Sequence, residues 1–342
     1  MKFSVGYQMT SSHSFMEYLA ENRDHIYEMY FSWGDIPNGR HSMLQSNDYL
    51  PWQAQQRQIE DLRFISDAGI KLNLLLNANC YGSDSQSRSF FCKIGDTIDF
   101  LKSGFLLASV TTTSPLIAKF IHENFKDIEV RASVNMGIGS IQGMRYLESY
   151  FDSFYMKREH NRCLSKIKEL KNWCDSVGKG LYILANSGCL NDCSAHTFHD
   201  NLVAHEADIA KMDNAYEFRG ICHDYLRDPK NRVSVLRDTN FIRPEDICLY
   251  DEYFTAAKLA TRVSRNPINT VKAYIRGHYS GSVNDILEPN HSGVLYPYII
   301  ENSKIPTDFT RHVMSCDKNC SNCDYCANAA EAAKVDLGCI EI

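Results

Sequence analysis

The chain has 342 residues, of which 44% are hydrophobic and 23% charged, and its formal net charge is -6 with a pI of about 6.1. This composition is typical of a globular protein that buries a full core. The charge gives no overall electrostatic signal for nucleic acid, although it does not preclude a local basic groove. No apolar stretch reaches the roughly 20 residues that span a bilayer, and no signal peptide follows Lys2. We therefore expect a cytoplasmic protein.

Eight apolar runs alternate with helix-like segments along the chain. The predicted strands are Lys2–Met9, Ile26–Trp33, Ile70–Asn77, Leu106–Thr113, Ile128–Met136, Phe151–Lys157, Leu181–Ala185 and Ala256–Thr261. The predicted helices are Ser14–Asn22, Ala54–Ala68, Asp96–Lys102, a helix opened by Pro115, Ser140–Tyr150, Arg158–Val177 and Asn269–Gly277. Strands that alternate with helices pair in parallel through right-handed crossovers. Eight such units predict a closed α/β barrel of the TIM type over residues 1–305.

Polar residues stand at the carboxyl ends of several predicted strands, among them Asn135, Asn186 and Arg262. Barrel enzymes place their chemistry at these ends. Each polar residue alone can simply mark where a strand stops. As a set, they predict a substrate site at this rim of the barrel.

The segment from Asn186 to His199 carries Cys189, Cys193, His196 and His199 directly after the seventh predicted strand. Two thiolates at C-x3-C spacing can turn toward one metal centre, because sulfur is the preferred ligand of iron-sulfur clusters and a common ligand of zinc. His196 and His199 can serve a cluster sulfide, a substrate or a proton relay, or can simply bond backbone carbonyls.

Two cysteines do not complete a metal site. Cys222 is the best candidate for a third ligand. Cys248 is the weaker alternative, because it follows a turn in an apolar strand-like stretch, where a packed cysteine is expected. Three such ligands would leave one position for a further cysteine or for substrate.

Beyond residue 306 the composition changes, and a polar segment holds Cys316, Cys320, Cys323 and Cys326 at C-x3-C-x2-C-x2-C spacing. A segment this polar cannot fold alone, so a metal is the expected source of its order. Four thiols in one tight run favour an iron-sulfur cluster, with structural zinc as the competitor. We therefore expect residues 306–342 to form a metal-binding tail packed on the barrel.

Other sequence patterns give less information about function. Five cysteines without a close cysteine neighbour are interpreted as small buried hydrophobic residues: Cys80, Cys92, Cys163, Cys174 and Cys339. The glycine-rich stretch from Gly137 to Gly143 departs from the dinucleotide-binding pattern and is interpreted as a tight turn, with phosphate binding as the lesser alternative. The chain has no P-loop, no zincin motif and no G-x-S-x-G elbow.

Several motifs resemble the collagenase-like peptidase family U32. They are Ala132-Ser133-Val134-Asn135, Asn161-Arg162, Asn186-x-Gly188-Cys189-Leu190-x-x-Cys193 with His199, Phe241 to Asp246, and Lys258-Leu259-Ala260-Thr261-Arg262. The cysteine-rich tail is similar to that of members from anaerobes. The resemblance implies a TIM-barrel iron-sulfur protein that acts in oxygen-independent hydroxylation of quinone precursors or RNA bases, in some cases as a pair of related subunits. It implies Cys189 and Cys193 as cluster ligands and, less firmly, Cys222. The ligand spacing and the tail depart from the hydroxylase members, so their substrate is not carried over.

These observations lead to one expectation with two rivals. We expect an oxygen-sensitive enzyme that holds one or two 4Fe-4S clusters and modifies a small molecule, peptide or RNA by redox or hydroxylation-type chemistry. Asn135, His196, His199 and Arg262 would position substrate, and a related subunit or an electron donor would be its partner. The rivals are an unconventional metal-dependent peptidase and a zinc-stabilised subunit without chemistry of its own.

Overall fold

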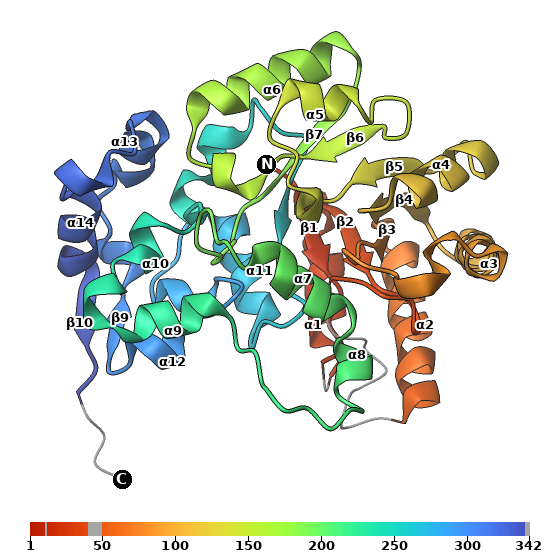
Figure 1. The fold of residues 1–342 in the computed structure, drawn as a ribbon, viewed down its shortest axis with the longest axis horizontal. Coiled ribbons are helices and arrows are strands. Elements are labelled where there is room, and N and C mark those ends of the chain that lie inside the picture. Colours follow the sequence, from red (N-terminus) through yellow and green to blue (C-terminus); the bar gives the residue numbers. More distant parts are fainter. Residues whose placement is uncertain (11, 40–49, 339–342) are drawn as a thin grey trace.

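Eight short parallel strands close into a barrel in the computed structural model, which describes residues 1–10, 12–39 and 50–338. The strands are β1 Phe3–Gly6, β2 Ile26–Phe31, β3 Lys71–Leu76, β4 Leu107–Thr112, β5 Glu129–Ala132, β6 Ser153–Tyr155, β7 Gly180–Leu184 and β8 Ala256–Leu259. Each strand pairs with the next, and β8 pairs with β1 (Figure 1). The predicted TIM-type fold and all eight predicted strands are confirmed.

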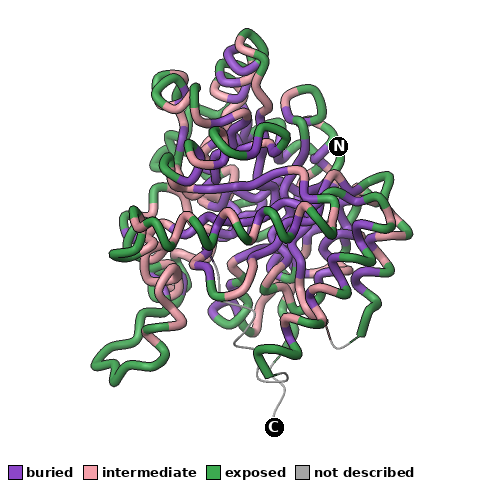
Figure 2. The backbone as a smooth tube through the Cα atoms, turned by 90° about the vertical axis from the view of Figure 1, so that its right-hand side faces the viewer, coloured by how far each residue is buried: buried purple, intermediate pink, exposed green. Residues whose placement is uncertain are grey.

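Helices surround the barrel and fill the longer connections. They are α1 Ser14–Glu21, α2 Pro51–Asp67, α3 Arg88–Gly104, α4 Pro115–Asn124, α5 Ile141–Arg145, α6 Leu164–Ser176, α7 His196–Ala204, α8 Glu206–Ile209, α9 Ile221–Arg227, α10 Ser234–Arg237, α11 Pro267–Arg276, α12 Ser292–Leu295, α13 Phe309–Ser315 and α14 Tyr325–Ala333. The buried residues occupy the middle of the molecule, and exposed residues follow its periphery (Figure 2). No helix in the described residues is long and apolar enough to cross a bilayer.

Three helix predictions differ from the structure. Helix α3 begins at Arg88, before the predicted start at Asp96, because the Ser87 side chain caps it by accepting from Phe90 N. Helix α5 ends at Arg145, five residues early. The long helix predicted from Arg158 is instead a 3-10 turn, Arg158–His160, followed by α6. The turn after β5 is confirmed, since Gly137 adopts a left-handed φ of 62°.

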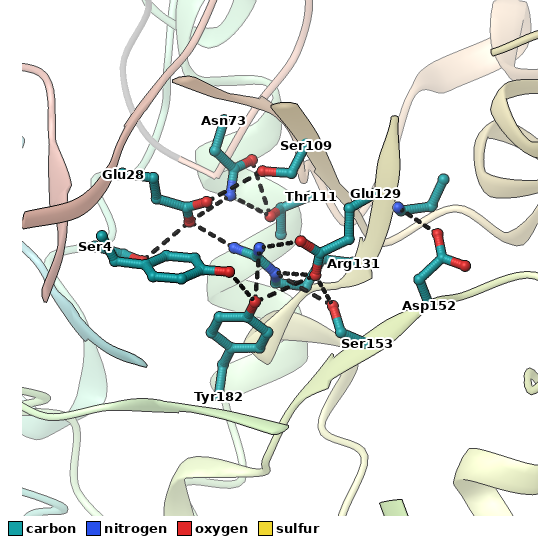
Figure 3. Close-up of polar contacts among 12 residues, drawn as sticks. Ser4, Glu28, Asn73, Ser109, Thr111, Glu129, Arg131, Asp152, Ser153 and Tyr182 are labelled. Atoms are coloured by element: carbon teal, nitrogen blue, oxygen red, sulfur yellow. Dashed lines mark hydrogen bonds and ion pairs between the residues drawn. The ribbon is translucent and has the colours of Figure 1, made fainter. Parts of the chain in front are cut away.

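The barrel interior is polar at the level of Arg131, although such interiors are usually filled by branched apolar side chains. The buried Arg131 guanidinium forms an ion pair with Glu28, donates to Glu129 Oε2 at 2.9 Å and lies 3.8 Å over the ring of Tyr182. Glu28 also accepts from Ser4, Asn73 and Ser109 (Figure 3). A charge buried this deeply is tolerated because it is paired and hydrogen-bonded.

The tail packs on the barrel through apolar helix faces. Buried residues on α13 and α14 join the main core: Phe309, Val313, Met314, Ala329, Ala330 and Ala333. Strand β10 (Lys334–Asp336) also pairs antiparallel with β9 (Tyr298–Ile300), which precedes the expected boundary at residue 306. Apolar packing therefore contributes to the order of the tail, whereas the sequence predicts a metal as the source of that order. The domain boundary at residue 306 stays a prediction.

Candidate functional site

The cysteine loop after β7 is fixed by the buried amide of Asn186. Its Nδ2 donates to Ala260 O and Ile286 O, both at 2.9 Å, and its Oδ1 accepts from Ala260 N at 2.7 Å. The side chain thus joins the ends of β7 and β8 to the segment around Ile286. These hydrogen bonds of the Asn186 side chain hold the start of the cysteine loop in place.

Gly188 allows a second backbone segment to approach the loop closely. A methyl group at this position would lie 2.2 Å from Pro289 O. Gly188 N donates to Glu288 O at 2.8 Å, and its carbonyl accepts from His291 Nε2 at 2.8 Å. Only glycine fits, and the cysteine that follows is held between β7 and residues 288–291.

Three predicted ligands come together at this rim. Cys189, Cys193 and Cys222 are each partly buried, and we call them the thiol triad. Burial raises the pKa of Cys222, and the charges of Cys189 and Cys193 raise it further. Cys222, at the start of α9, therefore lies within electrostatic range of Cys189 and Cys193 on the loop after β7.

Arg158 is a site residue that the sequence reading missed. It follows β6 and is buried, and its Nη1 donates to Cys189 Sγ at 3.2 Å. Its Nη2 donates to Asn135 Oδ1 at 3.4 Å, and Asn135 Nδ2 donates to Asn77 O at 3.3 Å. Asn135 therefore reaches the thiol triad through Arg158. A guanidinium in this position stabilises a thiolate or a sulfur ligand that carries negative charge.

The two histidines flank the thiol triad. His196 Nε2 lies 3.3 Å from Asp200 Oδ2, in a contact that lacks hydrogen-bond geometry. Burial lowers the pKa of His196, and the positive charge of Arg158 lowers it further. The ring of His199 packs edge-on against Phe218 at 5.4 Å. A methyl group at Gly220 would lie 3.4 Å from Cys222 Sγ and 3.9 Å from His199 Cε1, which places these two side chains around one point.

The remaining predicted residues belong to other parts of the chain. Arg262 Nη1 donates to Asn38 Oδ1 at 2.9 Å, at the ends of β8 and β2. Cys248 is exposed in a 3-10 turn, Pro244–Tyr250, so the expectation that it packs in an apolar strand is wrong. Of the five cysteines taken as buried hydrophobic residues, Cys174 is buried, Cys80 and Cys163 are half-buried, and Cys92 is exposed. Cys339 lies outside the described residues.

The four tail cysteines form a second group, the thiol tetrad: Cys316, Cys320, Cys323 and Cys326. Burial raises the pKa of Cys326 to about 11, the Arg162 guanidinium opposes the rise, and the other three cysteines add to it. Arg162 is itself buried and donates to Phe241 O and Leu236 O. Its guanidinium is thus anchored to the backbone of residues 236 and 241, within electrostatic range of Cys326.

One short segment separates the two groups of thiols. Residues 158–162 follow β6, and Arg158 contacts Cys189 while the charge of Arg162 acts on Cys326. Between them, Glu159 O accepts from Lys318 Nζ of the tail at 3.5 Å. The cysteine loop and the tail therefore both approach the β6–α6 connection.

The chemistry of these donors suits a thiophilic centre, since both groups offer several sulfur atoms beside an arginine. Within residues 1–10, 12–39 and 50–338, no three or more His, Cys, Asp or Glu side chains are already arranged to hold a metal ion. The donors fit an iron-sulfur cluster or zinc in kind, and binding would need the side chains to turn inward.

Comparison with known proteins supports the family resemblance. No protein-family model matches the chain. An uncharacterized protease of Methanocaldococcus jannaschii is 24% identical over 281 residues, which cover 80% of this chain and 80% of the relative. A solved U32 peptidase superposes with a TM-score of 0.51 at 13% identity, over 75% of this chain and 92% of that one. The chain resembles the U32 peptidases.

An α-amylase from Lactobacillus plantarum is more distant, with a TM-score of 0.36 at 10% identity over 53% of this chain and 61% of that one. The M. jannaschii relative and the solved U32 peptidase confirm the resemblance stated from the sequence motifs. Cys189 and Cys193 lie in the segment that follows the carboxyl end of β7.

Proposed function

We propose that this U32-like chain is an oxygen-sensitive iron-sulfur enzyme that carries out a redox or hydroxylation-type modification of a small molecule, peptide or RNA. The observation that carries the proposal is the hydrogen bond from Arg158 to Cys189 Sγ on the loop after β7, with Cys222 within electrostatic range of Cys189 and Cys193. A purely structural cysteine such as Cys174 is instead buried in the core.

Each group of residues has a distinct role in this proposal. The triad would hold one cluster, and the tetrad would hold a second one or a zinc ion. A bound cluster supplies one-electron transfer. Arg158 orients Cys189 and places positive charge beside its sulfur, and Asn135 holds Arg158 in turn. His196 and His199 stand where they can contact a substrate or donate a proton next to the triad.

Exposure of the tetrad supports an electron-entry role for the tail. Cys316, Cys320 and Cys323 are exposed, whereas the triad cysteines are partly buried. An electron donor could therefore approach the tail from solvent, with residues 158–162 between it and the triad. A redox partner or a related subunit is the partner that this arrangement favours.

Anaerobic purification followed by iron, zinc and acid-labile sulfide analysis tests the proposal. We expect a coloured protein with iron and sulfide in equal amounts, and a loss of the iron and sulfide of the triad cluster alone in Cys189→Ser and Cys193→Ser. Cys248→Ser is the matched control, because this exposed cysteine lies outside both thiol groups. A colourless protein that retains zinc in every variant would contradict the redox function and favour a zinc-stabilised subunit.

A peptidase is the second candidate, since both relatives carry a protease or peptidase name. The closeness of Cys222 and His199 to one point is the observation that favours it, because a thiol beside an imidazole can act as a nucleophile. This function predicts cleavage of gelatin or peptides that is lost in Cys189→Ala and Cys222→Ala. Cleavage that survives both changes would contradict it.

A further inference from the structure

The thiol triad leaves one ligand position open. Iron-sulfur clusters and structural zinc ions are usually held by four protein ligands, and Cys189, Cys193 and Cys222 supply three thiols. The four tail cysteines are coupled to one another as a separate group. A further side chain beside the cysteine loop is thus needed to complete a centre at the triad.

His196 follows the second cysteine of the loop within one helical turn. It is the first residue of α7, and its backbone N–H donates to Cys193 O at 3.0 Å. The two residues stand at C-x2-H spacing, which is within the range that commonly separates neighbouring ligands of one metal ion. Burial and then the positive charge of Arg158 lower the pKa of His196. The ring therefore lies within electrostatic range of the guanidinium that donates to Cys189.

A carboxylate that is fixed from another strand end faces one nitrogen of this ring. Asp200 lies one turn further along α7, and its Oδ2 is 3.3 Å from His196 Nε2. Asn79, which follows β3, donates from Nδ2 to the same Oδ2 at 3.2 Å. The Asp200 side chain is only 16% exposed. Asn79 thus holds the carboxylate, and a small rotation of the ring would give its contact with the carboxylate hydrogen-bond geometry.

The other nitrogen of the ring is available to a metal. His196 Nδ1 makes no hydrogen bond within residues 1–10, 12–39 and 50–338. A histidine that binds a metal through one nitrogen almost always directs its other nitrogen to a carboxylate, a carbonyl or water, which fixes the orientation of the ring. The pair of His196 and Asp200, with Asn79 behind it, has this arrangement.

Other histidines near the loop differ in their contacts. His291 already bonds a backbone carbonyl of the loop through Nε2 and is only 5% exposed. His223 lies 3.7 Å from Asp224, whose side chain is 75% exposed. The ring of His199 packs edge-on against an aromatic ring. The surroundings of His196 therefore match those of a metal ligand best.

We propose that His196 Nδ1 is the fourth protein ligand of the centre held by the thiol triad, and that Asp200 and Asn79 are positioning residues for its ring. The inference rests on the proposed function only in taking the triad as a metal centre. The described ligands are not yet arranged around one point, so binding would turn the imidazole and the three thiols inward. A zinc ion would take the same three sulfur atoms and one nitrogen. A neutral imidazole in place of a fourth thiolate would give a cluster a higher reduction potential.

Pulsed electron paramagnetic resonance on anaerobically prepared full-length protein tests the proposal. We expect the reduced cluster to show a strong nitrogen coupling that changes when the protein is made with isotopically labelled histidine. His196→Cys should keep the iron and sulfide content, lose this coupling and lower the reduction potential. Asp200→Asn should keep the coupling and bind its metal about tenfold more weakly in competition with a chelator.

His122→Gln is the matched control. His122 Nε2 lies 3.2 Å from Asp152 Oδ1, a similar pair of histidine and carboxylate that involves α4 instead of the cysteine loop. This change should leave the coupling, the reduction potential and the metal content as they are. A triad cluster without histidine coupling, or a coupling that His196→Cys leaves in place, overturns the proposal.

Metal analysis separates this inference from the redox function. If the protein is colourless and holds zinc, the redox function fails, and X-ray absorption at the zinc edge then identifies the ligands. The Cys320→Ser/Cys323→Ser double variant removes the contribution of the tetrad. Three sulfur atoms and one nitrogen, which His196→Cys converts to four sulfur atoms, would support His196 as the ligand. Four sulfur atoms with His196 in place, or a triad that binds neither metal, would overturn the proposal.

Discussion

Arg158 Nη1 lies 3.2 Å from Cys189 Sγ, although the two residues belong to different strand-helix connections of the barrel. The arginine leaves β6 and the cysteine leaves β7, and parallel pairing brings the ends of these strands to one rim. The contact makes the β6–α6 connection part of the cysteine site. It also gives that site a fixed positive charge.

Arg158→Gln should lower the reduction potential of a cluster held by the thiol triad. Hydrogen bonds and positive charge at a ligand sulfur favour the reduced, more negative cluster, so their removal favours the oxidised one. The measurement is an anaerobic redox titration followed by electron paramagnetic resonance. Lys119→Gln, an exposed change on α4, is the control. An unchanged potential in a variant that keeps its iron would show that Arg158 does not act on the cluster.

Gly188→Ala should disrupt the cysteine loop. The new methyl group would meet Pro289 O at 2.2 Å, and relief requires movement of one of two backbone segments that share hydrogen bonds. We expect a loss of about 1–3 kcal/mol in the free energy of unfolding and a lower iron content. Urea denaturation and metal analysis measure the two effects. Gly293→Ala is the control, since no atom lies within 4 Å of its new methyl group, and an equal effect of both changes would contradict the packing argument.

Cys222→Ser and Cys320→Ser should remove different metal populations. The triad and the tetrad are each coupled within their own group, so loss of one ligand should affect its own centre and leave the other in place. Iron, zinc and sulfide analysis of each variant, with Cys248→Ser as the control, measures this. Loss of all metal in either single variant would indicate one shared centre instead of two.

Arg131→Met should destabilise the barrel strongly. The change leaves Glu28 buried without its cation, and breaking a buried ion pair in this way costs about 3–5 kcal/mol. Lys93→Ala breaks the exposed pair with Asp35 and should cost at most about 1 kcal/mol. Urea denaturation monitored by circular dichroism compares the two, and similar midpoints would show that the interior network adds little stability.

Glu28 should also make stability depend on pH. Burial tends to raise its pKa, but the charge and hydrogen bonds of Arg131, together with Asn73 and Ser4, hold it below the usual value. A lowered folded-state pKa stabilises the protein above the unfolded pKa of about 4.3, and this stabilisation is lost as the pH falls through the folded value. Glu28→Gln should therefore flatten the fall in urea midpoint as the pH is lowered below about 5. A fall of the same steepness in both proteins would assign the acid sensitivity to other groups.

The barrel could be predicted from sequence because its strands are near-continuous apolar runs that alternate with helical segments. Each apolar run is visible within a few neighbouring residues, and every strand from β1 to β8 contains one. The polar interior was missed, although alternate residues such as Ser4, Glu28 and Arg131 interrupt those runs at strand spacing. That alternation marks a face, but only the closed sheet shows that the face is the inside of the barrel.

The candidate site was predicted in part. Cysteine spacing identified the loop and the tail, and it supported Cys222 as the third member of the triad. Arg158 was missed because its neighbours had helical spacing, whereas in the structure it lies in a turn whose buried side chain reaches across to β7. Apolar packing of the tail was missed as well, because the polar cysteine segment hid the apolar faces of α13 and α14.

An iron, zinc and acid-labile sulfide count on protein prepared without oxygen, together with its visible and electron paramagnetic resonance spectra, tests the central claim most directly. We predict iron and sulfide in equal amounts, with a cluster spectrum that Cys189→Ser abolishes or alters and Cys248→Ser leaves unchanged. Stoichiometric zinc in a colourless protein, without sulfide, would contradict the claim.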